Sequence, residues 1–131
     1  MSSFALVIEG APISSQAALT AFHFANAVLA KGHVIQRLFF YQDGVHNASA
    51  LSSTPQDEFN LPLAWQALIR QHGLDAVVCI SSAVRRGIVN AQEAERHGLP
   101  ASNLLEGFVI GGLGQLMEST RVADRVVRFP R

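Results

Sequence analysis

Short apolar runs recur along the chain, unbroken at 4–8 and 76–80, and longer stretches between them carry apolar residues at helical spacing. The runs are rich in β-branched or aromatic side chains and predict strands over 4–8, 33–41, 76–80, 107–110 and 125–129. The stretches between them predict helices over 14–31, 58–72, 91–97 and 112–120. Because strands alternate with helices, we expect a single α/β domain over residues 1–131: three layers, α/β/α, around a mostly parallel, roughly five-stranded sheet of flavodoxin-like type.

The helices have recognisable ends and core faces. Ser14 or Ser15 is predicted to cap the first helix, and glycine is predicted to end three of the four. In the helix over 58–72 the expected core residues are Phe59, Leu63, Leu68 and Ile69, with Trp65 on another face. The polar stretch 45–57 is predicted to be irregular, and irregular segments of this length often form lids or contact surfaces.

Composition narrows the function classes. Apolar residues make up 49% of the 131 residues and charged residues only 15%, which favours an oligomer that covers apolar surface. Ten basic and ten acidic side chains cancel, so no basic surface for direct nucleic-acid or membrane binding is expected. A single cysteine indicates a reducing compartment, and neither a signal peptide nor an apolar run of membrane-spanning length is found. We therefore expect a cytoplasmic protein.

Several common sites have no matching pattern. The histidines, at positions 23, 33, 46, 72 and 97, lack the pairwise spacing of a zinc site, so no metal is expected. The glycines at 111, 112 and 114 stand between a strand and a helix, but Met117 replaces the third small residue of a dinucleotide fingerprint. Close packing explains these glycines, and no cofactor is expected. No nucleophile elbow, P-loop or pair of catalytic carboxylates is present.

The strand over 76–80 carries the strongest candidate for chemistry, Cys79. Ser81 and Ser82 follow it and are able to cap a helix, and Arg85 and Arg86 add positive charge. Helix N–H groups and cations lower the pKa of a thiol, and the thiolate is the reactive form. Two interpretations stay open at this point: a reactive nucleophile at the rim of the sheet, or a small hydrophobic residue in the core. His46, in the stretch 45–57, is a further candidate at the same end of the sheet.

Several blocks in order resemble the TusD/DsrE family of sulfurtransferase subunits. They are FFYQDGVHNA at 39–48, STPQDEF at 53–59, VC at 78–79 with RRG at 85–87, AFHFA at 21–25, SNL at 102–104 and GLGQL at 112–116. The similarity spans nearly the whole chain. It implies a single DsrE-like domain in which Cys79 accepts persulfide sulfur from an upstream donor protein and passes it to a small carrier, without metal or cofactor.

Two branches of that family are consistent with the blocks. TusD-like subunits work with TusB- and TusC-like companions and a TusE-like acceptor, toward 2-thiouridine in tRNA. DsrE-like subunits work with DsrF- and DsrH-like companions and a DsrC-like acceptor in sulfur oxidation. Either branch implies a hetero-oligomer with no direct nucleic-acid or membrane contact. A non-catalytic scaffold subunit of such a relay is the alternative of another class, and the stretch 45–57 is the expected cover over the persulfide.

Overall fold

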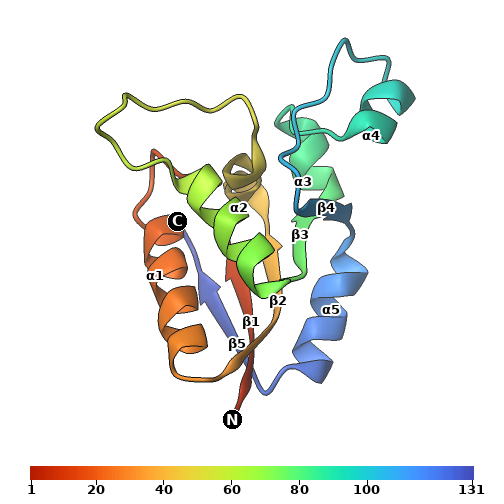
Figure 1. The fold of residues 1–131 in the computed structure, drawn as a ribbon. Helices are drawn as coiled ribbons and strands as arrows, with labels where there is room; N and C mark the ends of the chain where they lie inside the picture. The colour runs from red at the N-terminus through yellow and green to blue at the C-terminus, as the bar shows by residue number, and fades with distance from the viewer.

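The computed structural model describes all of residues 1–131 and contains one sheet of five parallel strands (Figure 1). The strand order is β4-β3-β2-β1-β5. Their bounds are β1 Ser3–Ile8, β2 Val34–Phe40, β3 Ala76–Cys79, β4 Phe108–Gly111 and β5 Arg125–Phe129. The predicted α/β fold with three layers is confirmed, and each predicted strand is present within about one residue of its expected ends.

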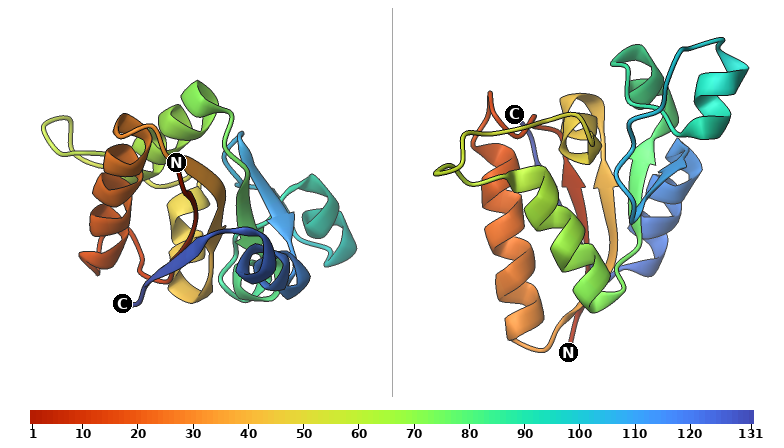
Figure 2. Two further views of the ribbon diagram at one scale, coloured as in Figure 1. Left: turned by 90° about the horizontal axis from the view of Figure 1, so that it is seen from below. Right: turned by 45° about the horizontal axis from the view of Figure 1, so that its top comes forward.

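Helices cover both faces of the sheet. Helices α1 (Ala17–Ala30) and α2 (Leu61–His72) lie on one face, and α5 (Leu113–Val122) lies on the other (Figure 2). The chain moves in one direction from β1 to β4 and then returns past them to β5. Right-handed crossovers in opposite directions place their helices on opposite faces, which explains the position of α5. None of these helices is long and apolar enough to span a bilayer.

Three short elements lie at the carboxyl end of the sheet. They are the 3₁₀ helix η1 (Gln42–Ala48), which follows β2, and the helices α3 (Ile80–Arg85) and α4 (Ala91–Arg96), between β3 and β4 (Figure 1). Because all five strands are parallel, every strand delivers its following loop to this same edge. In open α/β sheets ligands bind at this edge, so these short elements mark where a site is expected.

The larger core fills the space between the sheet and helices α1 and α2. Trp65 lies at its centre, fully buried, with its ring 5.1 Å from that of Phe22 and 5.4 Å from that of Phe40. The sequence interpretation therefore assigned the wrong buried face to α2, since Phe59 and Leu63 are exposed and Trp65 is in the core. Leu68 and Ile69 are buried, as predicted.

The predicted starts of α1 and α2 were wrong by two or three residues, whereas α4 begins at Ala91 as predicted and α5 within one residue of its expected start. Asn60 is the N-cap of α2, with its side chain accepting a hydrogen bond from the backbone N–H of Leu63, so the helix begins at 61 and not at 58. In α1 the N-cap residue is Gln16. Ser15 stands one position earlier and accepts a hydrogen bond from the N–H of Ala17. Local side-chain hydrogen bonds, rather than apolar spacing, decided both boundaries.

The stretch 45–57 is only partly irregular, which corrects the prediction. Its first four residues belong to η1, which packs tightly on the sheet. A Cβ on Gly44 would lie 1.9 Å from the carbonyl oxygen of Ile8, so this close approach requires glycine. The buried amide of Asn47 donates to the carbonyl oxygens of Gly10 and Gly44. These contacts hold η1 against the end of β1, and the irregular part begins only after Ala48.

Candidate functional site

Cys79 is the last residue of β3 and, at the same time, the N-cap residue of α3. The strand passes directly into the helix, so Ser81 and Ser82 lie within the first helical turn. The prediction that these serines cap the helix is therefore wrong. No side-chain hydrogen bond caps α3, and the cysteine occupies the position at which its sulfur faces the first turn.

The thiol is buried on the α5 face of the sheet. Cys79 is 1% exposed and packs with Phe39 and Val77, with Tyr41 and Leu116 at the border of the cluster. Its Sγ lies 3.6 Å from the Oγ of Ser81, and either atom is able to donate in this contact. The sulfur thus has an apolar side toward the sheet and a polar side toward the start of α3.

The first turn of α3 sets the ionisation of the thiol. Burial raises the pKa of Cys79. Hydrogen bonds from the first turn of α3 lower the pKa by more than burial raises it, so the net effect is a lowered pKa. These bonds come, in order of decreasing effect, from the backbone N–H of Ser82, the hydroxyls of Ser81 and Ser82, and the backbone N–H of Ser81. The serines therefore provide the stabilisation for which the sequence interpretation had also invoked Arg85 and Arg86. A lowered pKa increases the fraction of reactive thiolate at neutral pH.

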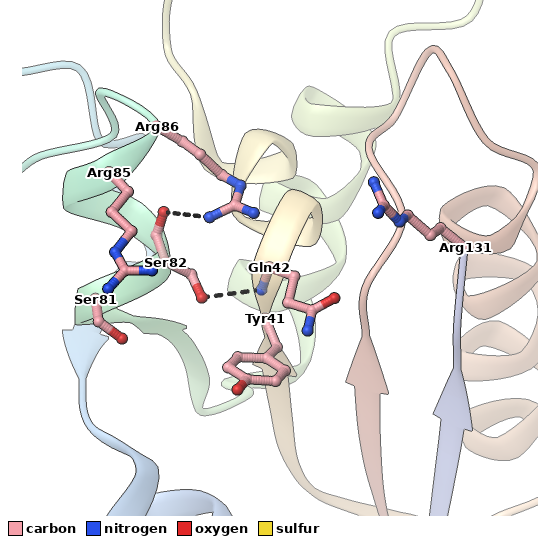
Figure 3. Close-up of a pocket in the computed structure, with 7 residues that line it drawn as sticks. All are labelled: Tyr41, Gln42, Ser81, Ser82, Arg85, Arg86 and Arg131. Atoms are coloured by element: carbon pink, nitrogen blue, oxygen red, sulfur yellow. Dashed lines mark hydrogen bonds between the residues drawn. The ribbon is translucent and has the colours of Figure 1, made fainter.

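A polar pocket of about 350 Å³ opens beside the start of α3 (Figure 3). It is lined by residues from the end of β2, from α3 and from the end of the chain: Tyr41, Gln42, Ser81, Ser82, Arg85, Arg86 and Arg131. Cys79 does not line this pocket. Ser81 does, and it also contacts the cysteine sulfur, so its hydroxyl lies between the thiol and the open space.

Hydrogen bonds across the pocket join α3 to η1. The guanidinium of Arg86 donates to Asp43 (Nε to Oδ1, 2.8 Å) and to the carbonyl oxygen of Ser82 (3.2 Å). The backbone N–H of Gln42, a residue with φ of 51°, donates to the Oγ of Ser82 (3.0 Å). These bonds fix the two elements that border the pocket.

The pocket carries excess positive charge. Asp43 also accepts a hydrogen bond from Arg131, and the pKa of Asp43 is lowered, chiefly by the hydrogen bond from Arg86. Arg85 is exposed and has no ion-pair or hydrogen-bond partner, and Figure 3 shows its guanidinium directed toward the pocket. Three guanidinium groups against one carboxylate favour an anionic ligand or intermediate.

Other candidates from the sequence lie outside this pocket. His46 is half-buried in η1 and does not line it. No residue of 45–57 lines it either, so the predicted cover does not lie over the cysteine end of α3. Sequence reasoning missed Tyr41, Gln42 and Arg131 as pocket residues. Tyr41 is the last residue of the predicted strand 33–41 and Gln42 directly follows it, which was the available signal for them.

Of the three glycines around the start of α5, only Gly111 serves close packing. A Cβ on Gly112 or Gly114 would meet nothing within 4 Å, so the sequence interpretation was wrong for these two. Gly111 pairs with Cys79 across the β3–β4 ladder. A Cβ at this position would lie 1.9 Å from the Oε1 of Gln115 and 2.7 Å from the Cγ1 of Val77. The missing side chain lets α5 approach the sheet beside the cysteine. No group of three or more His, Cys, Asp or Glu side chains in the chain is arranged to bind a metal ion.

Comparison with known proteins identifies the family. The DsrE/DsrF-like family matches residues 2–129. The chain belongs to the DsrE/DsrF-like family. It is 57% identical over 118 residues to a "Sulfurtransferase TusD homolog" of Pseudomonas aeruginosa, covering 90% of each chain. It is 46% identical over 129 residues to "Sulfurtransferase TusD" of Serratia proteamaculans, covering 98% of this chain and 100% of that one. The resemblance found in the sequence is confirmed.

A solved structure confirms the fold of this DsrE/DsrF-like protein. The crystal structure of the ychN protein from E. coli superimposes with a TM-score of 0.77 at 25% identity. The match covers 98% of this chain and 100% of the other. The arrangement of one parallel sheet with helices on both sides is therefore shared at full length.

Proposed function

We propose that this DsrE/DsrF-like protein is a sulfurtransferase subunit that carries persulfide sulfur on Cys79. The observation that carries the proposal is the position of the thiol: it stands at the junction of β3 and α3, has a lowered pKa, and contacts Ser81, which opens onto a cationic pocket. Relatives that align over nine-tenths or more of this chain are named sulfurtransferases, which supports the same chemistry here.

The proposed reaction has two balanced steps. In loading, the Cys79 thiolate attacks the outer sulfur of a donor persulfide, R–S–SH. The donor S–S bond breaks, Cys79–S–SH forms, and the donor leaves as the thiolate R–S⁻. In discharge, an acceptor thiolate R′–S⁻ attacks the outer sulfur of Cys79–S–SH. The acceptor becomes R′–S–SH, and Cys79 leaves as the thiolate, ready for another cycle.

The surroundings of Cys79 suit both steps. Groups that stabilise the thiolate also make Cys79 a better leaving group in discharge, because a thiol of lower pKa leaves faster. The outer sulfur of the persulfide stands about 2 Å beyond Sγ, so it is the atom nearest to a visiting partner. The free cation of Arg85 attracts anionic sulfur species to the pocket.

The names of the relatives favour one of the two branches considered for the route of the sulfur. We infer that the acceptor is a TusE-like carrier, that TusB- and TusC-like chains are the companion subunits, and that the sulfur goes toward tRNA 2-thiouridine, because the relatives are named TusD. The upstream donor is a persulfide-bearing protein. Sulfur passes between proteins in this scheme, so the subunit itself does not contact RNA.

Intact-mass measurement after incubation with a small-molecule persulfide tests the proposal. The wild-type protein is expected to gain the mass of a sulfur atom, and this gain is expected to disappear on treatment with excess thiol. Cys79→Ser is the matched control, because it keeps the size and position of the side chain but removes the sulfur nucleophile. Loading of the Cys79→Ser variant, or no loading of the wild type, would contradict the proposal.

The burial of Cys79 favours a second candidate function, a scaffold subunit without transfer activity. At 1% exposure the thiol is nearly closed to solvent. For a scaffold, Cys79 should resist alkylation by iodoacetamide in the native protein and react only after unfolding. For a sulfur carrier, alkylation should proceed in the native state and become faster as the pH rises through the thiol pKa.

A further inference from the structure

A second pocket, of about 330 Å³, lies between α3 and α4 and shares two residues with the first. From α3 it is lined by Ile80, Ser81, Val84 and Arg85, and from α4 and its end by Glu93, Arg96 and His97. Ser81 and Arg85 border both pockets. Since the hydroxyl of Ser81 contacts the Cys79 sulfur, the second pocket also lies one side chain away from the thiol.

This second pocket contains a buried carboxylate with an unpartnered oxygen. Glu93 is 5% exposed, and its Oε1 is buried without any hydrogen bond. The nearest cationic groups lie just beyond hydrogen-bond distance: His97 Nε2 is 3.6 Å from Oε1, and Arg96 Nε is 3.7 Å from Oε2. A buried carboxylate oxygen without a partner is costly, so Glu93 strongly favours any arrangement that supplies a donor.

His97 is the group best placed to supply that donor. It lies one helical turn after Glu93, and its side chain is 43% exposed, so the ring is free to close the short gap. With Nε2–H directed at Glu93, the other ring nitrogen, Nδ1, is the free acceptor. A carboxylate that holds one imidazole nitrogen in this way orients the ring and stabilises its protonated form.

We propose that His97, oriented by Glu93, takes the proton from the thiol of the sulfur acceptor when that thiol enters the pocket between α3 and α4. This inference rests on the proposed function. An ordinary alkyl thiol is mostly protonated at neutral pH, yet only its thiolate attacks a persulfide. Imidazole is the side chain best suited to remove a proton at that pH, so a base at the entry pocket increases the rate of discharge.

The step is balanced. The acceptor R′–SH gives its proton to Nδ1 of His97, and the resulting thiolate attacks the outer sulfur of Cys79–S–SH. The new R′–S–SH leaves with the outer sulfur, Cys79 remains as a thiolate, and His97 returns its proton to solvent. The charged groups around His97 are Glu93 and Arg96 on α4 and Arg85 on α3. The two arginines stabilise the thiolate, and Glu93 offsets their effect on the imidazolium.

Discharge to two small acceptors tests the proposal on the intact chain. The wild type and His97→Gln are loaded with persulfide, and single-turnover discharge is followed near neutral pH. One acceptor is 2-mercaptoethanol, which is mostly protonated there, and the other is an aromatic thiol that is already ionised. His97→Gln should slow discharge to 2-mercaptoethanol by roughly tenfold or more and leave discharge to the aromatic thiolate unchanged. His72→Gln, at the end of α2, is the matched control.

Glu93 acts through His97 as a positioning residue and has its own test. Glu93→Gln keeps the shape of the side chain but removes the carboxylate that orients the ring, so it should slow discharge to 2-mercaptoethanol and leave discharge to the aromatic thiolate unchanged. Equal slowing with both acceptors in His97→Gln, or no slowing with either, would overturn the proposal. Absence of persulfide loading in the wild type would instead refute the sulfurtransferase function, and this inference with it.

Discussion

The Oγ of Ser81 lies 3.6 Å from the Sγ of Cys79, and Ser81 lines both of the pockets that border α3. The serine thereby joins a thiol that is nearly closed to solvent to two pockets, on the two sides of α3. This contact exists because β3 runs into α3 without a connecting loop, which places the cysteine and the serine in the same helical turn.

Replacing Ser81 with alanine should raise the pKa of Cys79, because the hydroxyl is among the groups that lower it. Alkylation of Cys79 by iodoacetamide at neutral pH should slow a few-fold, and its pH profile should shift to higher pH. Ser102→Ala, a change at an exposed serine outside both of these pockets, is the control. An unshifted profile would show that the hydroxyl does not stabilise the thiolate.

The lowered pKa of Cys79 should also make folding stability depend on pH. The thiol ionises at lower pH in the folded protein than in the unfolded chain, where its pKa is near the ordinary value of 9.0. The thiolate therefore contributes stability that is fully present above the unfolded pKa and is lost as pH falls through the folded pKa. The unfolding free energy of the wild type, minus that of Cys79→Ala, should rise with pH up to about pH 9.5 in urea titrations. A flat or falling difference would contradict the assigned direction.

Substitutions of Arg85 and Arg86 should have different effects on the stability of the protein but the same effect on the electrostatics of the first pocket. Both line the first pocket, so removing either charge should lower the ratio of alkylation rates by anionic iodoacetate and neutral iodoacetamide. Arg86→Gln should also cost about 1 kcal/mol of stability through loss of its half-buried ion pair with Asp43. Arg85→Gln should leave the melting temperature unchanged, since Arg85 has no partner.

Arg70→Gln is the control for the arginine pair, because its ion pair with Glu106 is exposed and lies on α2. Its rate ratio should match that of the wild type. Added salt should reduce the ratio in the wild type and have less effect in the Arg85 variant, as screening removes the same attraction. A rate ratio that is insensitive to Arg85 would exclude it from the electrostatics of the site.

Gly111 and Gly114 form a matched pair for the packing of α5. Gly111→Ala places a Cβ within 1.9 Å of Gln115 Oε1 and 2.7 Å of Val77 Cγ1, so a loss of about 1–3 kcal/mol is expected. Gly114→Ala meets nothing within 4 Å in the first turn of α5 and should stabilise the protein by roughly 0.5 kcal/mol or more. Thermal or urea unfolding of both variants provides the measurement. Equal effects would mean that the close approach does not depend on Gly111.

The same pair of substitutions should also differ in their effect on the alkylation rate of Cys79. Gly111 lies opposite Cys79 in the ladder, so a forced shift of Gln115 and Val77 disturbs the wall of the thiol cluster. Gly111→Ala should therefore alter the alkylation rate of Cys79 in the native protein, while Gly114→Ala should not.

Much of the fold was determined by local patterns that the sequence displays directly. Apolar, β-branched and aromatic runs predicted all five strands. The runs at 4–8 and 76–80 are unbroken, because a strand covered on both faces needs no polar alternation. The family blocks and the cysteine at the end of β3 were also readable from the sequence. Helix starts and the buried face of α2 were not, because capping by Asn60 and the packing of Trp65 against Phe22 and Phe40 depend on neighbours that are remote or outside the apolar pattern.

By itself, then, the sequence determined the succession of strands and helices and the position of the cysteine at a strand end, since both follow from short-range apolar patterns. Only the tertiary structure decided what surrounds that sulfur. It placed the serines inside α3, paired Arg86 with Asp43 across the pocket, and left Arg85 free. It also buried Glu93 next to His97. The Arg86–Asp43 pair joins elements distant in sequence that meet at one edge of a parallel sheet, so residue spacing does not encode it. Glu93 and His97 are neighbours on one helix, but the burial of Glu93 depends on the packing of the whole chain.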